Sequence, residues 1–149
     1  MKIGIVGSEE AKFTPAAENK AKDAITKLIA DAVLANNGDA PTIVSGECHL
    51  GGIDIWAKDI AAEWLCPFIG FPPKTLSWSG GYKERNLQIA RESDIVVCIT
   101  VKNFPPDYTG MRFPYCYHCK TDAHIKSGGC WTVKQALKMG KKGQIIVVE

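Results

Sequence analysis

Short apolar runs alternate along the chain with longer segments in which apolar residues recur at helical spacing. The short runs are rich in β-branched side chains, which is typical of parallel strands buried on both faces. They predict strands at residues 2–7, 41–45, 66–70, 94–101 and 144–149. Because DIVVCITV (94–101) is the most β-branched of them, we expect it at the centre of the sheet.

Four segments between these runs show the period of an α-helix. In the first helix, apolar residues at 21, 24, 25, 28, 29, 32 and 33 mark one face, and Asn36-Asn37-Gly38 ends it. Further helices are expected at 54–65, 82–93 and 132–140. In the 82–93 helix, the buried side should carry Leu87, Ile89 and Ala90.

Strands that alternate with helices predict an α/β fold, a three-layer sandwich around a parallel, five-stranded Rossmann-like sheet. The 149 residues suffice for one domain with a core of its own, spanning 1–149. Residues 102–127 form an irregular, cysteine-rich insertion before the last helix. Because ordered loops of that length are uncommon, we expect a bound metal to stabilise it. Ligands of such sheets bind beyond the carboxyl ends of the strands, where the strand order reverses.

Composition narrows the classes of partner. A net charge of +2 with 23% charged residues disfavours a strongly basic nucleic-acid binder. No apolar run is long enough to cross a membrane, and no secretory signal pattern is visible, so we expect a cytoplasmic protein. The six cysteines are then expected to be reduced, and Cys98 to lie in the core.

Two glycine-rich loops lie between a predicted strand and a predicted helix. The first is GECHLGGID, with Gly46, Gly51 and Gly52, and the second carries Gly128 and Gly129. These glycines could serve turn geometry alone. Because both loops fall on the same predicted edge, we favour binding of phosphate or ribose by backbone N–H groups at helix N-termini.

Several polar residues are predicted to assist these loops. Arg85 could hold a phosphate with its planar guanidinium or be an ordinary surface residue, and Asp54 could cap a helix or accept from a ribose hydroxyl. Cys48 and His49 are adjacent in sequence and cannot easily form a nucleophile–base pair. The complete set of predicted ligand contacts is Gly7, Ser8, Ser45, Gly46, Gly51, Gly52, Asp54, Arg85, Asn86, Ser127, Gly128, Gly129 and Thr132.

The most specific local signal is a C-x2-C-x4-H-x5-C pattern. Zinc prefers four tetrahedral nitrogen or sulfur ligands, and the pattern offers Cys116, Cys119, His124 and Cys130. His118 competes with His124 for the imidazole position. Alternatively, the first two cysteines are a redox or idle pair. We expect a structural zinc.

Taken together, GIVGS, SGECHLGGIDIWA, GYKERNLQIARESDIVV and SGGCWTVKQALKMGKKGQIIVVE resemble the SLOG superfamily of Rossmann-like domains. That superfamily includes Lonely-guy phosphoribohydrolases, molybdenum-cofactor carrier proteins and DNA-processing protein A domains. The resemblance covers nearly the whole chain and implies that a nucleotide or nucleotide-derived ligand binds, with Arg85 and Thr132 at family positions. Family members are often oligomeric, so a homo-oligomer is expected as well.

The chain departs from the Lonely-guy pattern, which is similar to PGGxGTxxE. Trp131 replaces its last glycine, and Gln135 replaces the glutamate that serves hydrolysis. Because glutamine cannot act as a general base, we expect a binding or sensing domain. The alternatives are a nucleoside-phosphate N-glycosidase, with Arg85 on the phosphate and Glu47 or Asp54 as the acid, and a single-stranded nucleic-acid accessory protein. The latter would stack bases on Tyr115, Tyr117 and Trp131.

Overall fold

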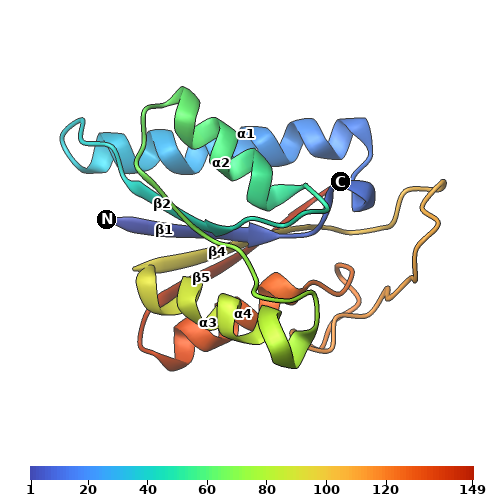
Figure 1. The fold of residues 1–149 in the computed structure, drawn as a ribbon. Coiled ribbons are helices and arrows are strands. Elements are labelled where there is room, and N and C mark those ends of the chain that lie inside the picture. The colour runs from blue at the N-terminus through green and yellow to red at the C-terminus, as the bar shows by residue number, and fades with distance from the viewer.

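The computed structural model describes residues 1–149 and contains one parallel sheet between two layers of helices (Figure 1). The strands are β1 (Lys2–Gly7), β2 (Thr42–Gly46), β3 (Phe68–Phe71), β4 (Ile95–Val101) and β5 (Lys142–Val148). The helices are α1 (Pro15–Ala35), α2 (Ile53–Glu63), α3 (Lys83–Glu92) and α4 (Gly128–Lys138). A 3-10 turn, η1 (Glu10–Lys12), and a π-helical turn, η2 (Trp78–Tyr82), complete the set. The predicted α/β Rossmann-like fold is confirmed.

The strand order is β3-β2-β1-β4-β5, and every neighbouring pair is parallel. Strands β2 and β3 therefore follow β1 toward one edge of the sheet, and β4 and β5 then lie on the other side of β1. The prediction that 94–101 is central is wrong, because β1 occupies the middle and β4 lies beside it. The β-branched character of β4 reflects its burial on both faces, which β1 shares. The strand order reverses between β1 and β4, where ligands of this architecture bind.

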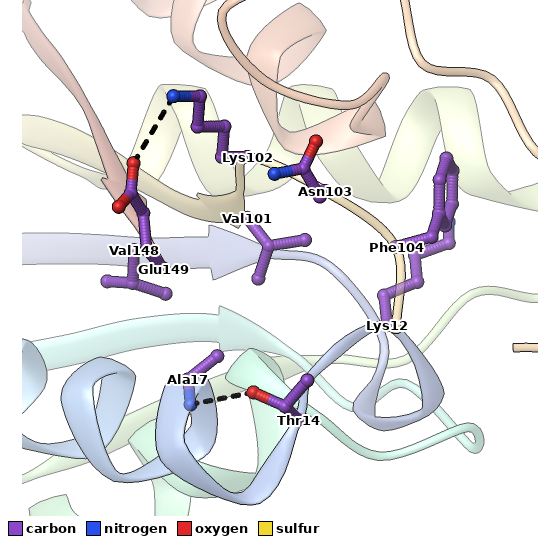
Figure 2. A pocket seen from close by; sticks show the side chains of 9 residues that line it. All are labelled: Lys12, Thr14, Ala17, Val101, Lys102, Asn103, Phe104, Val148 and Glu149. Atoms are coloured by element: carbon purple, nitrogen blue, oxygen red, sulfur yellow. Dashed lines mark hydrogen bonds and ion pairs between the residues drawn. The ribbon is translucent and has the colours of Figure 1, made fainter. Parts of the chain in front are cut away.

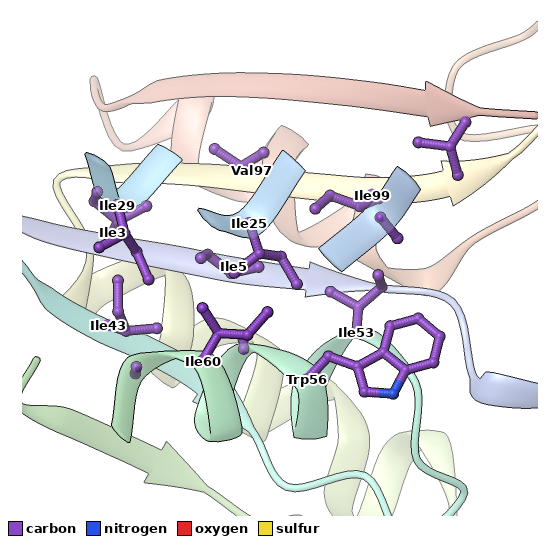
Figure 3. Close-up of a cluster of buried hydrophobic side chains, with 14 of the residues drawn as sticks. Ile3, Ile5, Ile25, Ile29, Ile43, Ile53, Trp56, Ile60, Val97 and Ile99 are labelled. Atoms are coloured by element: carbon purple, nitrogen blue, oxygen red, sulfur yellow. The ribbon is translucent and has the colours of Figure 1, made fainter. Parts of the chain in front are cut away.

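Each face of the sheet has its own core. Alternate strand residues such as Ile3, Ile5 and Ile99 point toward α1 and α2, which lie together on one face (Figures 1 and 3). Their neighbours, Val6 and Cys98 among them, pack with α3 and α4 on the other face. The strands are thus apolar along their whole length because both faces are covered.

Two helices begin earlier than the apolar period predicts. Helix α1 begins at Pro15, because the Thr14 hydroxyl accepts from the Ala17 N–H (3.1 Å) and a proline suits the first helical position. Helix α4 begins at Gly128, where Ser127 supplies the cap. Their starts are marked by capping residues rather than by the apolar period, so hydrophobic periodicity alone does not detect them.

Helix α3 buries a partly polar face. Arg85, Asn86, Ile89 and Ala90 are buried, whereas Leu87 is only half-buried. The expectation that Leu87 belongs to the buried side is therefore wrong, because Arg85 and Asn86 take that position and bond to each other (Nε to Oδ1, 2.8 Å).

Residues 102–127 are irregular, as expected. This loop leaves β4, runs out beyond the end of the sheet and returns to α4 (Figure 1). Its regular pairing is limited to one antiparallel bridge between Cys116 and Thr121. No helix of the chain combines the length and apolarity that a membrane crossing requires.

Candidate ligand cleft and metal centre

A cleft of about 430 Å³ opens at the carboxyl end of the sheet, where the strand order reverses. Its walls come from the end of β1, the loop before α2, the η2 turn and the N-terminus of α4. The lining residues are Val6, Gly7, Ser8, Glu9, Lys12, Cys48, Leu50, Asp54, Trp78, Tyr82, Arg85, Asn86, Lys126, Ser127, Gly128, Gly129 and Thr132. Segments far apart in the sequence therefore converge on one cavity.

The first turn of α4 forms one wall of this cleft. Ser127 Oγ accepts from the Gly129 N–H (3.3 Å), while the Gly128 N–H has no acceptor within the protein. A β-carbon on Gly129 would lie 2.7 Å from the Cys98 sulfur, so only glycine lets α4 approach the sheet this closely. A β-carbon on Gly128 would meet nothing within 4 Å. The turn therefore presents a free backbone donor at the positive end of a helix dipole.

A buried ion pair forms another part of the cleft lining. Arg85 Nη1 lies 3.4 Å from Asp54 Oδ2, and the two side chains are only 9% and 7% exposed. Burial raises the pKa of Asp54 above its ordinary value, and the Arg85 guanidinium and the Ser45 hydroxyl offset this only in part. A β-carbon on Gly46 would lie 1.8 Å from Arg85 Nη1, so glycine there makes room for the guanidinium.

Aromatic side chains flank the polar walls. Trp78 and Tyr82 are four residues apart, and the π-helical geometry of η2 brings both to the cleft. Trp78 is 45% exposed and packs edge-on against Trp131 of α4 (centroids 4.8 Å, 82°). The Tyr82 ring lies beside the Arg85 guanidinium, at 5.0 Å. One side of the cleft can thus accept a flat apolar group.

The structure brings nine predicted contacts together in the cleft and leaves four outside its lining. The nine are Gly7, Ser8, Asp54, Arg85, Asn86, Ser127, Gly128, Gly129 and Thr132. The other four are Ser45, which donates to the Ile5 carbonyl (2.5 Å), and Gly46, Gly51 and Gly52, which pack against protein atoms. Sequence reasoning missed Lys12, Lys126, Trp78 and Tyr82, although WSGGY between two predicted elements is an unusual spacing of aromatic residues and glycines.

The cysteine and histidine pattern closes into a compact cluster. One ligand atom from each of Cys116, Cys119, His124 and Cys130 lies within 4.8 Å of all the others, and three of the four residues are buried. This group can hold a metal ion. The structure selects His124 over His118, which instead packs against the Tyr117 ring at 4.4 Å.

Hydrogen bonds at His124 and Cys116 favour metal binding, whereas Cys119 and Cys130 are held as thiols and must lose their protons to bind a metal. His124 Nδ1 lies 2.8 Å from the Ile125 carbonyl, which assigns the proton to Nδ1 and leaves Nε2 free to bind a metal. At Cys116, burial disfavours the thiolate, but backbone N–H groups of Cys119, Ser127 and His118 favour it more and lower its pKa. Burial and the neighbouring sulfurs of Cys130 and Cys116 raise the pKa of Cys119 to about 12. A hydrogen bond to the Cys98 sulfur, together with burial, also raises the pKa of Cys130.

A smaller pocket of about 210 Å³ lies near the carboxyl ends of β4 and β5 (Figure 2). Lys102 pairs with Glu149 (3.5 Å) on one side, and Thr14 is engaged in the cap of α1 on the other. Three of its polar residues, Lys102, Glu149 and Thr14, are thus engaged within the pocket lining itself. The 430 Å³ cleft, with the free Gly128 N–H and with Lys126, which pairs with no carboxylate, is the better candidate for a ligand site.

Comparisons with known proteins bear on the fold. No protein-family model matches the chain, and a search of curated protein sequences finds no match. Among solved structures, the chain is similar to the molybdenum cofactor carrier protein MCP from Chlamydomonas reinhardtii. The TM-score is 0.57 at 19% sequence identity, over 97% of this chain and 74% of that chain. At this identity, the similarity is one of fold: a Rossmann-like parallel sheet.

Proposed function

We propose that this protein binds a nucleotide or nucleotide-derived ligand in the 430 Å³ cleft, with the phosphate on the first turn of α4. The observation that carries this proposal is the free N–H of Gly128 at a helix N-terminus beside the cleft-lining cations Lys12 and Lys126. The buried Arg85, which is paired with Asp54, also lines the cleft. The SLOG resemblance supports the same ligand class, as does the fold of a cofactor carrier protein.

The aromatic wall would hold the other end of the ligand. Trp78 is half-exposed at the cleft and is braced by Trp131, so its ring can stack on a planar base without first being ordered. A phosphate on α4 and a base on Trp78 would together account for both the polar and the apolar walls of the cleft.

Titration calorimetry with AMP, adenosine and inorganic phosphate tests this assignment. We expect AMP to bind at least tenfold more tightly than adenosine, because the phosphate meets the α4 N-terminus and Lys126. Lys126→Ala should weaken AMP binding, whereas Lys134→Ala, an exposed lysine of α4 outside the cleft lining, should not. Equal affinities for AMP and adenosine would argue against the phosphate site.

A second candidate is cleavage of a nucleoside-phosphate N-glycosidic bond. Asp54 is the observation that favours it, because a carboxyl with a raised pKa in a cleft can protonate a leaving base. Glu47 is outside the cleft lining and pairs with Lys58 (2.7 Å). Free base released from AMP by the wild type, and not by Asp54→Asn, would support an enzyme. Binding without release would leave the carrier or sensor assignment.

We also propose that the metal is a structural zinc. Three thiolates and an imidazole are a closed zinc ligand set, and tetrahedral bonds of about 2.3 Å to sulfur require ligand spacings of roughly 3.7 Å. The four ligand atoms, within 4.8 Å of one another, need only a small contraction. Native mass spectrometry should show one zinc per chain that is lost in the denatured spectrum. A native mass equal to that of the bare chain would contradict the proposal.

A further inference from the structure

We infer that the metal centre positions the phosphate-binding turn of α4, so that ligand affinity depends on metal occupancy; the inference rests on the proposed function of the cleft. The first link is Cys130. This metal-ligand residue belongs to the first turn of α4, directly after Gly128 and Gly129, and its N–H donates to the Ser127 carbonyl (3.1 Å). Fixing the Cys130 sulfur therefore fixes the turn that presents the free Gly128 N–H.

Ser127 is the second link. Its hydroxyl caps α4 by accepting from the Gly129 N–H, and it also lies 3.6 Å from the Cys98 sulfur, which in turn lies 3.9 Å from the sulfur of Cys130. Ser127 thus bonds to the phosphate-binding turn and contacts the metal-ligand residue Cys130 through Cys98. Because Ser127 is 3% exposed, water cannot readily replace these partners.

Lys126 is the third link, and it contributes charge. Its ammonium lies over the rings of Phe113 (5.2 Å) and Tyr117 (5.4 Å), and its backbone N–H donates to the Phe113 carbonyl (3.0 Å). Phe113 and Tyr117 lie on either side of Cys116 in the sequence. A cation that lines the cleft is therefore held by the segment that the metal would fix.

Apart from Ile125, whose side chain is fully buried in the core, few backbone bonds hold residues 113–126. These backbone bonds are the Cys116–Thr121 bridge, the Lys126–Phe113 bond and a bond from the Ile125 N–H to the Val101 carbonyl (3.1 Å). Helix α4, in contrast, also packs through Val133 and Ala136. Metal loss should therefore loosen residues 113–131 and leave the rest of the sheet and its helices intact.

The test combines two measurements on full-length protein in its zinc-loaded and chelator-treated forms. Hydrogen exchange reports positioning without any ligand: exchange in residues 113–131 should accelerate at least tenfold without metal, while α1 remains unchanged. Calorimetry with AMP reports the consequence: affinity should fall at least fivefold and recover when zinc is returned. Cys119→Ser removes one half-buried ligand residue, and Cys66→Ser, outside the cluster, is the matched control.

Each outcome decides a separate statement. Unchanged exchange in residues 113–131 after metal removal overturns the positioning, whether or not AMP binds. Faster exchange with unchanged AMP affinity overturns the dependence of binding on the metal. If neither form binds AMP, the proposed ligand site fails, and faster exchange still supports the positioning of the turn. If Cys119→Ser does not fold, the chelator-treated wild type gives the same readouts.

Discussion

The two glycine loops look alike in sequence and differ in what fills the space beside them. At the end of β2, a side chain on Gly46 would meet Arg85, and in the loop that follows, one on Gly52 would meet the backbone of Ser8 and Glu10. At the start of α4, a side chain on Gly128 would meet nothing. Glycine thus permits close packing at Gly46 and Gly52, and also at Gly129, whereas at Gly128 it leaves open space. A glycine-rich loop between strand and helix indicates close approach, but the approaching group can be the protein itself.

The largest effect is expected in the packed loop. Gly52 has φ +85°, and an alanine β-carbon there would lie 2.4 Å from the Ser8 carbonyl oxygen. Backbone strain and overpacking together should lower the free energy of unfolding of Gly52→Ala by about 3 kcal/mol. Urea denaturation monitored by circular dichroism measures this loss. A loss below about 1 kcal/mol would show that the loop can shift to accommodate the added methyl group. Gly52 would then be less tightly packed, relative to Gly128, than we infer.

The next effect concerns the metal centre beside the open turn of α4, whose affinity for zinc should depend on pH. Cys119, with a pKa of about 12, and Cys130, whose pKa is also raised, are thiols near neutral pH and must lose their protons to bind zinc. Zinc affinity should therefore rise with pH, by about 100-fold per unit between pH 6 and 8 if two protons are released. Competition with a zinc-binding dye at several pH values measures the slope. A flat profile would exclude these thiols as ligands.

Substitution of Trp78 tests whether the base and the phosphate of the ligand bind at different walls of the cleft. Trp78→Ala should weaken AMP binding about tenfold, because one stacked base is lost, and leave phosphate binding unchanged. Trp64→Ala removes a tryptophan of similar exposure, 42%, beyond the end of α2 and serves as the control. An equal loss for AMP and phosphate would place the base elsewhere.

The smallest effect is expected at Gly128. Alanine is a better helix former than glycine and finds open space there, so Gly128→Ala should change the free energy of unfolding by no more than about 0.5 kcal/mol. AMP affinity should nevertheless fall several-fold, because the added methyl takes up part of the open space beside the free N–H. A large loss of stability would show that this turn, too, is packed.

The sequence was informative wherever a pattern is local. Apolar runs located the five strands, and the cysteine and histidine spacing located a cluster that the fold closes. The contrast between Gly46 and Gly128 could not be predicted, because it depends on Arg85, which is distant in sequence and comes from another helix. Lys126 and Trp78 were missed for a related reason: each lies in an irregular segment that only the tertiary structure directs toward the cleft.

The bond between the Ile125 N–H and the Val101 carbonyl has a consequence for how the chain can change in length. It joins the two ends of the long loop, so residues 102–124 leave the sheet and return to the same place. The strands do not depend on how many residues lie between these ends. Since the entropy of closing a flexible loop grows only logarithmically, doubling its length costs about 0.6 kcal/mol. Insertions and deletions should therefore be tolerated between the metal-ligand segment and β4 far better than anywhere in the sheet.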